Sequence, residues 1–253
     1  MMLNKIEHDG VLELQLARPP VNALNPALVA ELRTAIADAP AHGARALILS
    51  GSEGMFSAGL DVPELLHLDR PAMQAFWQDF IELLHTIAVS TVPIVATITG
   101  HSPAGGAVLA LFCDARFAAA GEFKMGLNEV QVGLPVPAII HAALKRLVGA
   151  HQAERLCLHG LLIAPEEAQR IGFVDQVLPF ERLRPAALSW CQSLLALPPG
   201  AVAATRKTAR ADLVAEFAEL GSRSHEQLMQ VWFSDETQAA MRKLVEQLHA
   251  KKA

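Results

Sequence analysis

The sequence predicts an α/β fold in which helices cover a parallel sheet. Two short, apolar strands over residues 46–49 and 93–98 are separated by a Leu-rich helical stretch over residues 61–89. A strand, a crossover helix and a second strand form a βαβ unit whose strands pair in parallel. With 253 residues, of which 52% are apolar and 19% charged, the chain can bury a large core, which excludes a disordered chain.

The first elements are a hairpin and a helix. Strands over residues 5–8 and 11–16 flank the pair Asp9-Gly10, which tolerates the positive φ of a tight turn. After a proline-containing loop, Asn25 is placed to cap a helix that begins at Pro26. The apolar stripe of this helix, at helical spacing, consists of Leu28, Leu32, Ala35 and Ile36.

After the second apolar strand the alternation continues and then gives way to helices. A helix, a strand and a helix are expected over residues 105–112, 115–119 and 137–147. From about Phe180 onward the chain reads as almost entirely helical, with a break at residues 198–200. The final helix is expected to begin at residues 234–236 and to end in Lys251-Lys252.

Charge and cysteine content exclude several classes of protein. The 21 Lys and Arg against 26 Asp and Glu give a net charge of −5, so nucleic acid is not an expected partner. Cys113, Cys157 and Cys191 are widely spaced in apolar surroundings, which is typical of buried thiols in a reducing compartment and fits no disulfide framework or zinc site. Residues 1–16 enter strand-like alternation without a signal or import leader, and we expect a cytoplasmic protein.

One stretch requires a comparison with membrane spans. Residues 83–113 contain no Asp, Glu, Lys or Arg, and a spanning helix needs about 20 continuously apolar residues. Prolines and glycines interrupt this stretch, among them Pro93, Gly100 and Pro103. A buried strand, a turn and a buried helix are therefore expected, and no membrane partner.

Two glycine-containing loops are candidates for chemistry, Phe-Ser-Ala-Gly-Leu-Asp at 56–61 and His-Ser-Pro-Ala-Gly-Gly at 101–106. Each follows an apolar strand, and open α/β sheets bind ligands at the carboxyl ends of their strands. The N–H groups of Leu60 and Gly105 are expected at the N-terminal ends of helices, where the helix dipole favours a developing anion. Either loop alone also fits an ordinary turn in which glycine provides tightness. Neither loop fits a dinucleotide fingerprint, a P-loop or a nucleophile elbow.

Three motifs in this order resemble the crotonase, or enoyl-CoA hydratase/isomerase, superfamily: residues 56–61, 103–106 and 126–129 (Gly-Leu-Asn-Glu). The resemblance runs from about Val11 to Val177. It includes Pro-Val-Asn-Ala-Leu at 20–24, Cys113-Asp114 and Ala-x-x-x-Gly-x-Val-Asp at 168–175. It implies a crotonase-like spiral of ββα units over 1–195 and a helical trimerisation region over 196–253, and hence a homotrimer or a dimer of trimers.

The resemblance also implies the substrate, an acyl-CoA thioester whose carbonyl oxygen lies between the N–H groups of Leu60 and Gly105. Enolate charge develops on that oxygen when a C2 proton leaves, so two donors there stabilise the transition state. CoA belongs to the substrate, and no further cofactor and no metal ion are expected. The substrate contacts implied besides Leu60 and Gly105 are Ala58, Gly59, Asp61, Val62 and Asn128. Asp61 serves equally well as a helix N-cap, and Asn128 is also a common turn residue.

The carboxylates subdivide the superfamily. Its hydratases use two glutamates that orient water, and the matching positions here hold Val108 and Glu129. A single carboxylate suits the movement of a proton between two carbons better than the addition of water. This pattern resembles the Δ3,Δ2-enoyl-CoA isomerases of fatty-acid β-oxidation.

Glu129 is then the expected single acid and base, which removes the C2 proton of a 3-enoyl-CoA and returns it to C4. Its apolar neighbours in sequence should raise its pKa toward neutrality: Met125, Leu127, Val130 and Val132. The alternative is a solvated surface-loop glutamate, since most glutamates are exposed. Glu53 and Glu122 are the nearby rivals, each in a turn-like context.

Other functions share these motifs. A hydratase, a thioesterase and a decarboxylase of the same superfamily would use the same oxyanion hole, so the fold alone does not separate them. A non-catalytic CoA-binding protein is the alternative from another class, and Glu129 argues against it. Some relatives bind RNA, for which the acidic balance gives little support.

Several residues remain open at the level of sequence. Phe76, Trp77 and Phe80 fit an acyl tunnel or, more commonly, a plain core. His101 lies close to the oxyanion loop without a partner that the sequence reveals. Where related proteins place an aromatic and a basic residue near the CoA adenine and 3′-phosphate, this chain has Leu244 and Gln247; the candidate substitutes are Lys243, Arg242 and Arg206.

Overall fold

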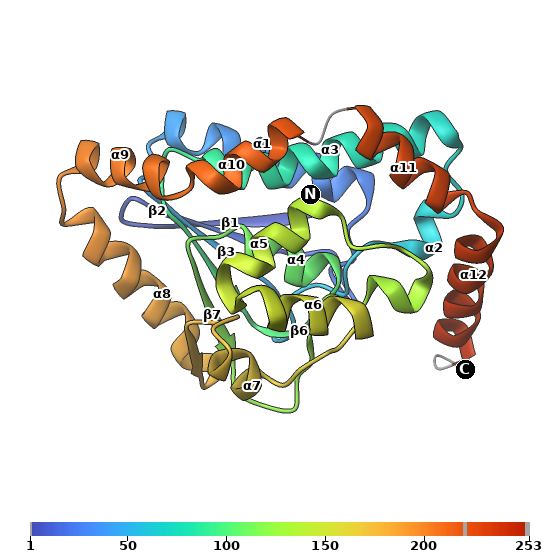
Figure 1. Cartoon of the computed structure of the whole chain (residues 1–253). Helices are drawn as coiled ribbons and strands as arrows, with labels where there is room; N and C mark the ends of the chain where they lie inside the picture. The colour runs from blue at the N-terminus through green and yellow to red at the C-terminus, as the bar shows by residue number, and fades with distance from the viewer. Residues whose placement is uncertain (1, 220–221, 251–253) are drawn as a thin grey trace.

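A six-stranded sheet lies at the centre of the computed structural model, which describes residues 2–219 and 222–250 (Figure 1). The strand order is β1-β2-β3-β5-β7-β9; β1 and β2 are antiparallel, and every later pair is parallel. The strands are β1 Leu3–His8, β2 Val11–Leu16, β3 Ala46–Ser50, β5 Ile94–Ile98, β7 Ala115–Ala119 and β9 Gln176–Leu178. The predicted hairpin and apolar parallel strands are confirmed.

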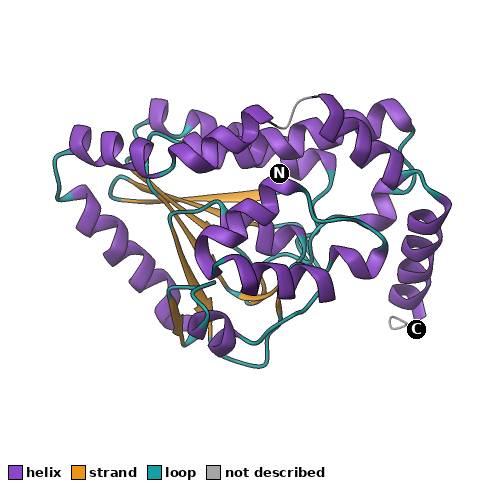
Figure 2. Cartoon of the chain, viewed as in Figure 1, coloured by secondary structure: helices purple, strands orange, loops and turns teal. Residues whose placement is uncertain are grey.

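Helices pack on both sides of this sheet (Figure 2). They are α1 Pro26–Asp38, α2 Val62–Leu65, α3 Arg70–Val89, α4 Gly105–Leu111, α5 Ala138–Val148, α6 Ala150–His159, α7 Pro165–Arg170, α8 Phe180–Leu195, α9 Pro199–Ala209, α10 Ala211–Glu219, α11 Ser222–Trp232 and α12 Asp235–Ala250. Two short 3-10 helices, η1 Pro40–His42 and η2 Glu129–Val132, join them. The predicted Lys251-Lys252 end of the last helix lies outside the described residues.

The two faces of the sheet are covered differently. On one face, α8 contacts β3, β5 and β7 through its buried side chains Leu183, Ala187 and Cys191. The larger core, on the other face, joins the sheet to α1 and α3. As predicted, the Oδ1 atom of Asn25 accepts a hydrogen bond from the N–H of Leu28 (2.9 Å) and caps α1.

The aromatic stripe of α3 belongs to this core. Phe76, Trp77 and Phe80 are each no more than 4% exposed, and Trp77 meets the fully buried Trp232 of α11 edge to face. The stripe therefore joins the C-terminal helices to the centre of the fold. All three cysteines are buried free thiols, as predicted.

A second, three-stranded sheet was not predicted. It consists of β4 Gly54–Met55, β6 Gly100–Pro103 and β8 Met125–Gly126, all parallel, in the order β4-β6-β8. Gly100 lies so close to the backbone of Gly54 that a Cβ on Gly100 would overlap it. Only glycine permits this approach of the two strands.

The uncharged stretch 83–113 folds as expected for a buried core. It includes the last part of α3 together with β5, β6 and α4. Every residue of β5 and α4 is buried. Within the described residues, no helix is long and apolar enough to cross a membrane.

Two arginines anchor the C-terminal helices. Arg206 and Arg210 pair with Asp114 at 2.9 Å and donate to main-chain carbonyls at the C-terminal end of α3, including that of Ala88. Cations at a helix C-terminus also interact favourably with its dipole. The predicted division at residues 195 and 196 falls between α8 and α9; that these parts form separate domains stays a prediction.

Candidate active site

The three sequence motifs leave the carboxyl ends of the three strands of the small sheet. Residues 56–61 follow β4, residues 104–106 follow β6, and residues 127–129 follow β8. The sequence predicts that the first two loops directly follow β3 and β5. In the structure they do not, because β4 and β6 intervene. Backbone bonds join the loops, since Phe56 donates to His101 (3.0 Å) and Ala104 donates to Gly126 (2.8 Å).

Hydrogen bonds to Leu24 hold the main chain on both sides of Leu60 in the sequence. The N–H of Leu24 donates to the carbonyl of Gly59 (2.8 Å), and the N–H of Asp61 donates to the carbonyl of Leu24 (3.0 Å). In such a parallel bridge the middle residue directs its own N–H away from the pairing strand. The carbonyl of Leu60 accepts from Val62 (2.9 Å), whereas the N–H of Leu60 has no hydrogen-bond partner within the described chain.

A second free N–H lies at the first residue of α4. The N–H of Gly105 has no partner among the described residues, as expected for the first turn of a helix. A Cβ on Gly59 would lie 3.0 Å from the nitrogen of Gly105, so the two loops meet backbone to backbone. Two N–H groups without partners therefore lie in neighbouring loops, which is one requirement of an oxyanion hole.

The turn before Gly105 is strained. Ala104 has φ 45° and ψ −122°, a region that non-glycine residues rarely adopt and that costs about 1–3 kcal/mol. Its N–H bond to Gly126 and its carbonyl, which accepts from Val108 (2.9 Å), hold it there. Backbone strain that is maintained by surrounding hydrogen bonds is found mainly at functional sites.

Two buried residues, Asn22 and Ser57, hold the main chain of the Leu60 loop through hydrogen bonds. The hydroxyl of Ser57 donates to the carbonyl of Asn22 (2.7 Å) and accepts from the N–H of Gly59 (3.2 Å). The amide of Asn22 donates to the carbonyl of Phe56 (3.1 Å). The motif at residues 20–24 carries no sequence signal of this role, because its partners are main-chain atoms far along the chain.

Glu129 begins η2, directly after the loop that leaves β8. Burial raises its pKa to about 7, and its Oε2 atom is buried without a hydrogen-bond partner. Helix α6, which carries Cys157, contacts η2. Burial, and secondly the charge of Glu129, raise the pKa of the Cys157 thiol to about 11. The rivals Glu53 and Glu122 are exposed. Glu129 therefore combines the position and the desolvation expected of a proton-transferring acid and base.

The residue at the position of a second glutamate offers no acid or base. Val108 is 1% exposed within α4 and belongs to the main core. Asn128, beside Glu129, has a buried Oδ1 atom without a partner, and its Nδ2 atom lies 3.5 Å from the Oε1 atom of Gln131.

The predicted substrate contacts of the first loop differ in exposure. Gly59 and Val62 are buried, and Ala58 and Leu60 are partly exposed. Asp61 caps α2, because its Oδ1 atom accepts from the N–H of Glu64 (3.0 Å). Its other oxygen pairs with Arg18 at 2.7 Å, an interaction that the sequence did not indicate.

Other candidates from the sequence lie elsewhere. Arg206 is only 9% exposed and is committed to Asp114 and main-chain carbonyls, so its suggested contact with the CoA phosphate is wrong. Arg242 and Lys243 are exposed on α12. The Nδ1 atom of His101 accepts from the N–H of Lys124 (3.1 Å), which gives this ring a structural partner.

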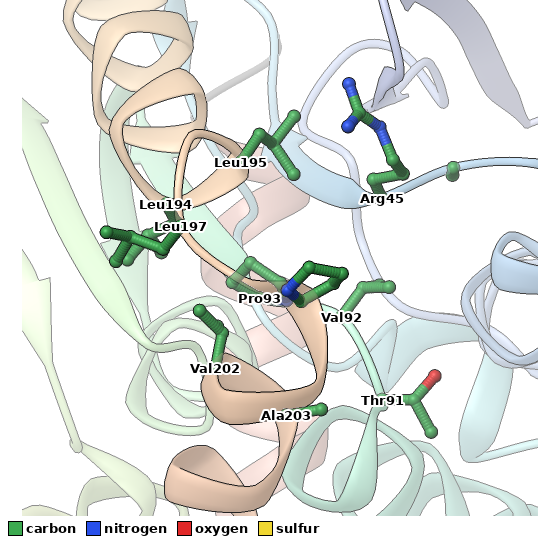
Figure 3. A pocket seen from close by; sticks show the side chains of 11 residues that line it. Arg45, Thr91, Val92, Pro93, Leu194, Leu195, Leu197, Val202 and Ala203 are labelled. Atoms are coloured by element: carbon green, nitrogen blue, oxygen red, sulfur yellow. The ribbon is translucent and has the colours of Figure 1, made fainter.

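A cavity of about 170 Å³ is lined by residues outside the three motifs. It is next to the amino ends of β3 and β5, whereas the motif loops follow carboxyl ends. Its lining is largely apolar, with Arg45 at its edge directing the guanidinium away from the apolar side chains (Figure 3). Within the described residues, no three His, Cys, Asp or Glu side chains group as metal ligands.

Comparisons with known proteins identify the family of the chain. The family described as enoyl-CoA hydratase/isomerase matches residues 7–251. The chain is 34% identical over 206 residues to the human mitochondrial enoyl-CoA delta isomerase 1, a match covering 79% of this chain and 68% of the relative. It is 33% identical over 201 residues to a probable enoyl-CoA hydratase of Mycobacterium avium, covering 78% and 77%.

The fold gives the same result. The crystal structure of the human mitochondrial Δ3,Δ2-enoyl-CoA isomerase has a TM-score of 0.96 with this chain at 29% identity, and the match covers 100% of both. The predicted crotonase-like fold is confirmed by this likeness. Since the family match extends over nearly the whole chain, the protein is an enzyme of the enoyl-CoA hydratase/isomerase family.

Proposed function

We propose that the protein is a Δ3,Δ2-enoyl-CoA isomerase that converts 3-enoyl-CoA to 2-enoyl-CoA with Glu129 as its single acid and base. The observation that carries this proposal is the carboxyl group of Glu129, whose Oε2 atom is buried without a hydrogen-bond partner and whose pKa burial raises to about 7. A group of this pKa is available in both protonation states near neutral pH, as a residue that takes and returns one proton requires.

The reaction begins when the Glu129 carboxylate takes the C2 proton. The electron pair of the C2–H bond moves toward the thioester, and a dienolate forms with negative charge on the carbonyl oxygen. The N–H groups of Leu60 and Gly105 donate to that oxygen; the loss of one such donor typically costs about 10²–10³ in rate. The protonated Glu129 then gives its proton to C4, and the double bond ends between C2 and C3.

Isomerisation is favoured over hydration by Val108. A hydratase of this superfamily orients water between two carboxylates, and Val108 is a buried apolar residue at one of those positions. The relatives named as isomerases support the same choice. The relative named as a probable hydratase makes water addition to 2-enoyl-CoA the second candidate.

The experiment supplies 3-enoyl-CoA and 2-enoyl-CoA separately, following the absorbance of the conjugated thioester and the mass of a hydrated product. We expect 3-enoyl-CoA to be converted and Glu129→Gln to lose this activity. Glu122→Gln, at an exposed glutamate, is the matched control and should keep it. Rapid hydration of 2-enoyl-CoA that persists in Glu129→Gln would overturn the proposal.

Three further parts of the proposal concern the surroundings of the reaction. We propose that CoA is needed only as part of the substrate, that the protein is cytoplasmic, and that it assembles as a homotrimer or a dimer of trimers. The three buried free thiols support a reducing compartment. Light scattering of the purified protein tests the assembly, and a stable monomer would contradict it.

A further inference from the structure

We propose that Arg18 is a positioning residue that fixes the direction of the Leu60 N–H group. This inference rests on the proposed use of that N–H as an oxyanion donor. Arg18 lies in the loop between β2 and α1, with its side chain 24% exposed. No motif of the sequence marked it.

The guanidinium joins the two segments that flank the oxyanion donor. Its Nη2 atom lies 2.7 Å from the Oδ2 atom of Asp61, the residue after Leu60, and 2.9 Å from the Oε2 atom of Glu64 in α2. Its Nη1 atom donates to the carbonyl of Ala23 (3.0 Å), the residue before Leu24. Arg18 therefore connects the same two stretches of chain that the Leu24 bridge pairs.

This connection controls an orientation. While Leu24 bonds to the carbonyl of Gly59 and to the N–H of Asp61, the Leu60 N–H points away from the Leu24 segment. Arg18 attaches to the side chain of Asp61 on one strand and to the main chain of Ala23 on the other, so it resists rotation of the intervening peptide. An arginine can do this because its planar fork donates in two directions at once.

The charges oppose a role for Arg18 in binding the CoA phosphates. Asp61 and Glu64 place two carboxylates on one guanidinium, which leaves this cluster with a net negative charge. The amide of Asn25 donates to both oxygens of Glu64 at 3.0 Å and holds that carboxylate in place. A phosphate would have to displace these partners, so the geometry favours a clamp within the protein.

A misdirected donor weakens transition-state stabilisation more than substrate binding, because the oxygen carries most charge in the transition state. We therefore expect Arg18→Met to lower kcat about 10- to 100-fold, below the loss of a whole donor, and to change KM less than threefold. Arg18→Lys, which retains the charge but not the fork, should lie between Arg18→Met and the wild type.

The matched control is Arg33→Met. Arg33 also forms an ion pair, with Asp79 at 3.3 Å, but joins α1 to α3 outside the site. We expect it to leave kcat unchanged. Equal losses of kcat in Arg18→Met and Arg33→Met would overturn the inference.

Asp61→Asn tests the path through Asp61. Asparagine caps a helix as well as aspartate does, so this variant removes the ion pair and keeps the cap. If Arg18 acts through Asp61, the double variant Arg18→Met/Asp61→Asn should have the same kcat as Arg18→Met alone. Independent, additive losses would contradict this. Asp61→Asn also tests the inference if Arg18→Met fails to fold.

A spectroscopic measurement separates this inference from the isomerase assignment. A saturated thioester such as decanoyl-CoA, labelled with ¹³C at its carbonyl, has no double bond to move. Its infrared carbonyl band should shift to lower frequency on binding to the wild type, and the shift should shrink in Arg18→Met but not in Arg33→Met. An unchanged shift in Arg18→Met would overturn the role of Arg18, even if 3-enoyl-CoA is isomerised. A reduced shift without isomerisation would keep that role and reject the isomerase.

Discussion

The hydroxyl of Thr237 donates a 2.8 Å hydrogen bond to the carbonyl of Gly133, so the last helix holds the turn that follows Glu129. Thr237 is 1% exposed in the first turn of α12, and Gly133 ends η2 with φ 75°. The carbonyl of Glu129 accepts from Leu134 within the same turn (3.1 Å). The position of Glu129 therefore depends on the C-terminal helix.

We expect Thr237→Val to lower the free energy of unfolding by about 1–3 kcal/mol, because the partly buried carbonyl of Gly133 would lose its donor. Urea unfolding measures this loss. Thr237→Ser keeps the hydroxyl and should retain most of the stability. Equal stability of the valine variant and the wild type would show that this bond does not hold the turn.

Under the proposed mechanism the rate of isomerisation should rise with pH and level off above about 7, because there the carboxylate form of Glu129 takes the first proton. The measurement is kcat against pH with 3-enoyl-CoA. Glu122→Gln should leave the profile unchanged. A flat profile from pH 5 to 9 would contradict a raised pKa.

Glu129 should also make stability depend on pH. Burial raises its pKa in the folded protein from 4.5 to about 7, so the folded state binds more protons than the unfolded state between these values. The contribution of Glu129 to the free energy of unfolding is fully present below pH 4.5 and is lost as the pH rises through 7. Glu129→Gln should therefore gain stability over the wild type at pH 8 and not at pH 4, as thermal unfolding at the two pH values can show.

Glycine substitutions test the contact between the two oxyanion loops. Gly59 has φ 86° and its Cβ position lies 3.0 Å from the nitrogen of Gly105, whereas Gly43 has φ 92° and open space around it. Both alanine variants incur similar backbone strain. Only Gly59→Ala should lower kcat, by about 10²-fold or more, since it displaces a donor. Similar activity of the two variants would argue against the contact.

The buried carboxylate of Glu13, paired with a half-exposed arginine, provides a stability prediction. Glu13, 2% exposed, accepts from Ser50 (2.6 Å) and from Arg184 of α8 (2.8 Å). Burial alone would raise its pKa, but these hydrogen bonds outweigh burial and lower it. Glu13→Gln should cost about 1–3 kcal/mol at pH 7, and this difference should shrink as the pH falls below 4.5. Unchanged kcat confirms that the effect is confined to stability.

The larger sheet and the capped helices could be predicted because their signals are local. The apolar stretch 46–49 reads as a buried strand, and Asn25 before Pro26 reads as a cap. The small sheet could not be predicted, because β4 and β8 have two residues each and are held by main-chain bonds to segments distant in sequence.

The same distinction holds for the site. The resemblance pointed to Leu60, Gly105 and Glu129, and the structure places them on neighbouring loops. Arg18 was missed because its three partners lie 5 to 46 residues away and form no pattern. Arg206 was misjudged, since a basic residue in a helix reads as solvent-exposed until its buried partner Asp114 is seen.

In the proposed mechanism the two oxyanion donors belong to the main chain, whereas the acid and base is a side chain. A point mutation can delete Glu129 or place a second carboxylate at Val108, but it leaves the N–H groups of Leu60 and Gly105 chemically intact. The capacity to hold enolate charge is thus inherited with the backbone path, while the choice of reaction varies with a few side chains. Divergence within such a family can change the product without rebuilding the part of the catalyst that activates the thioester.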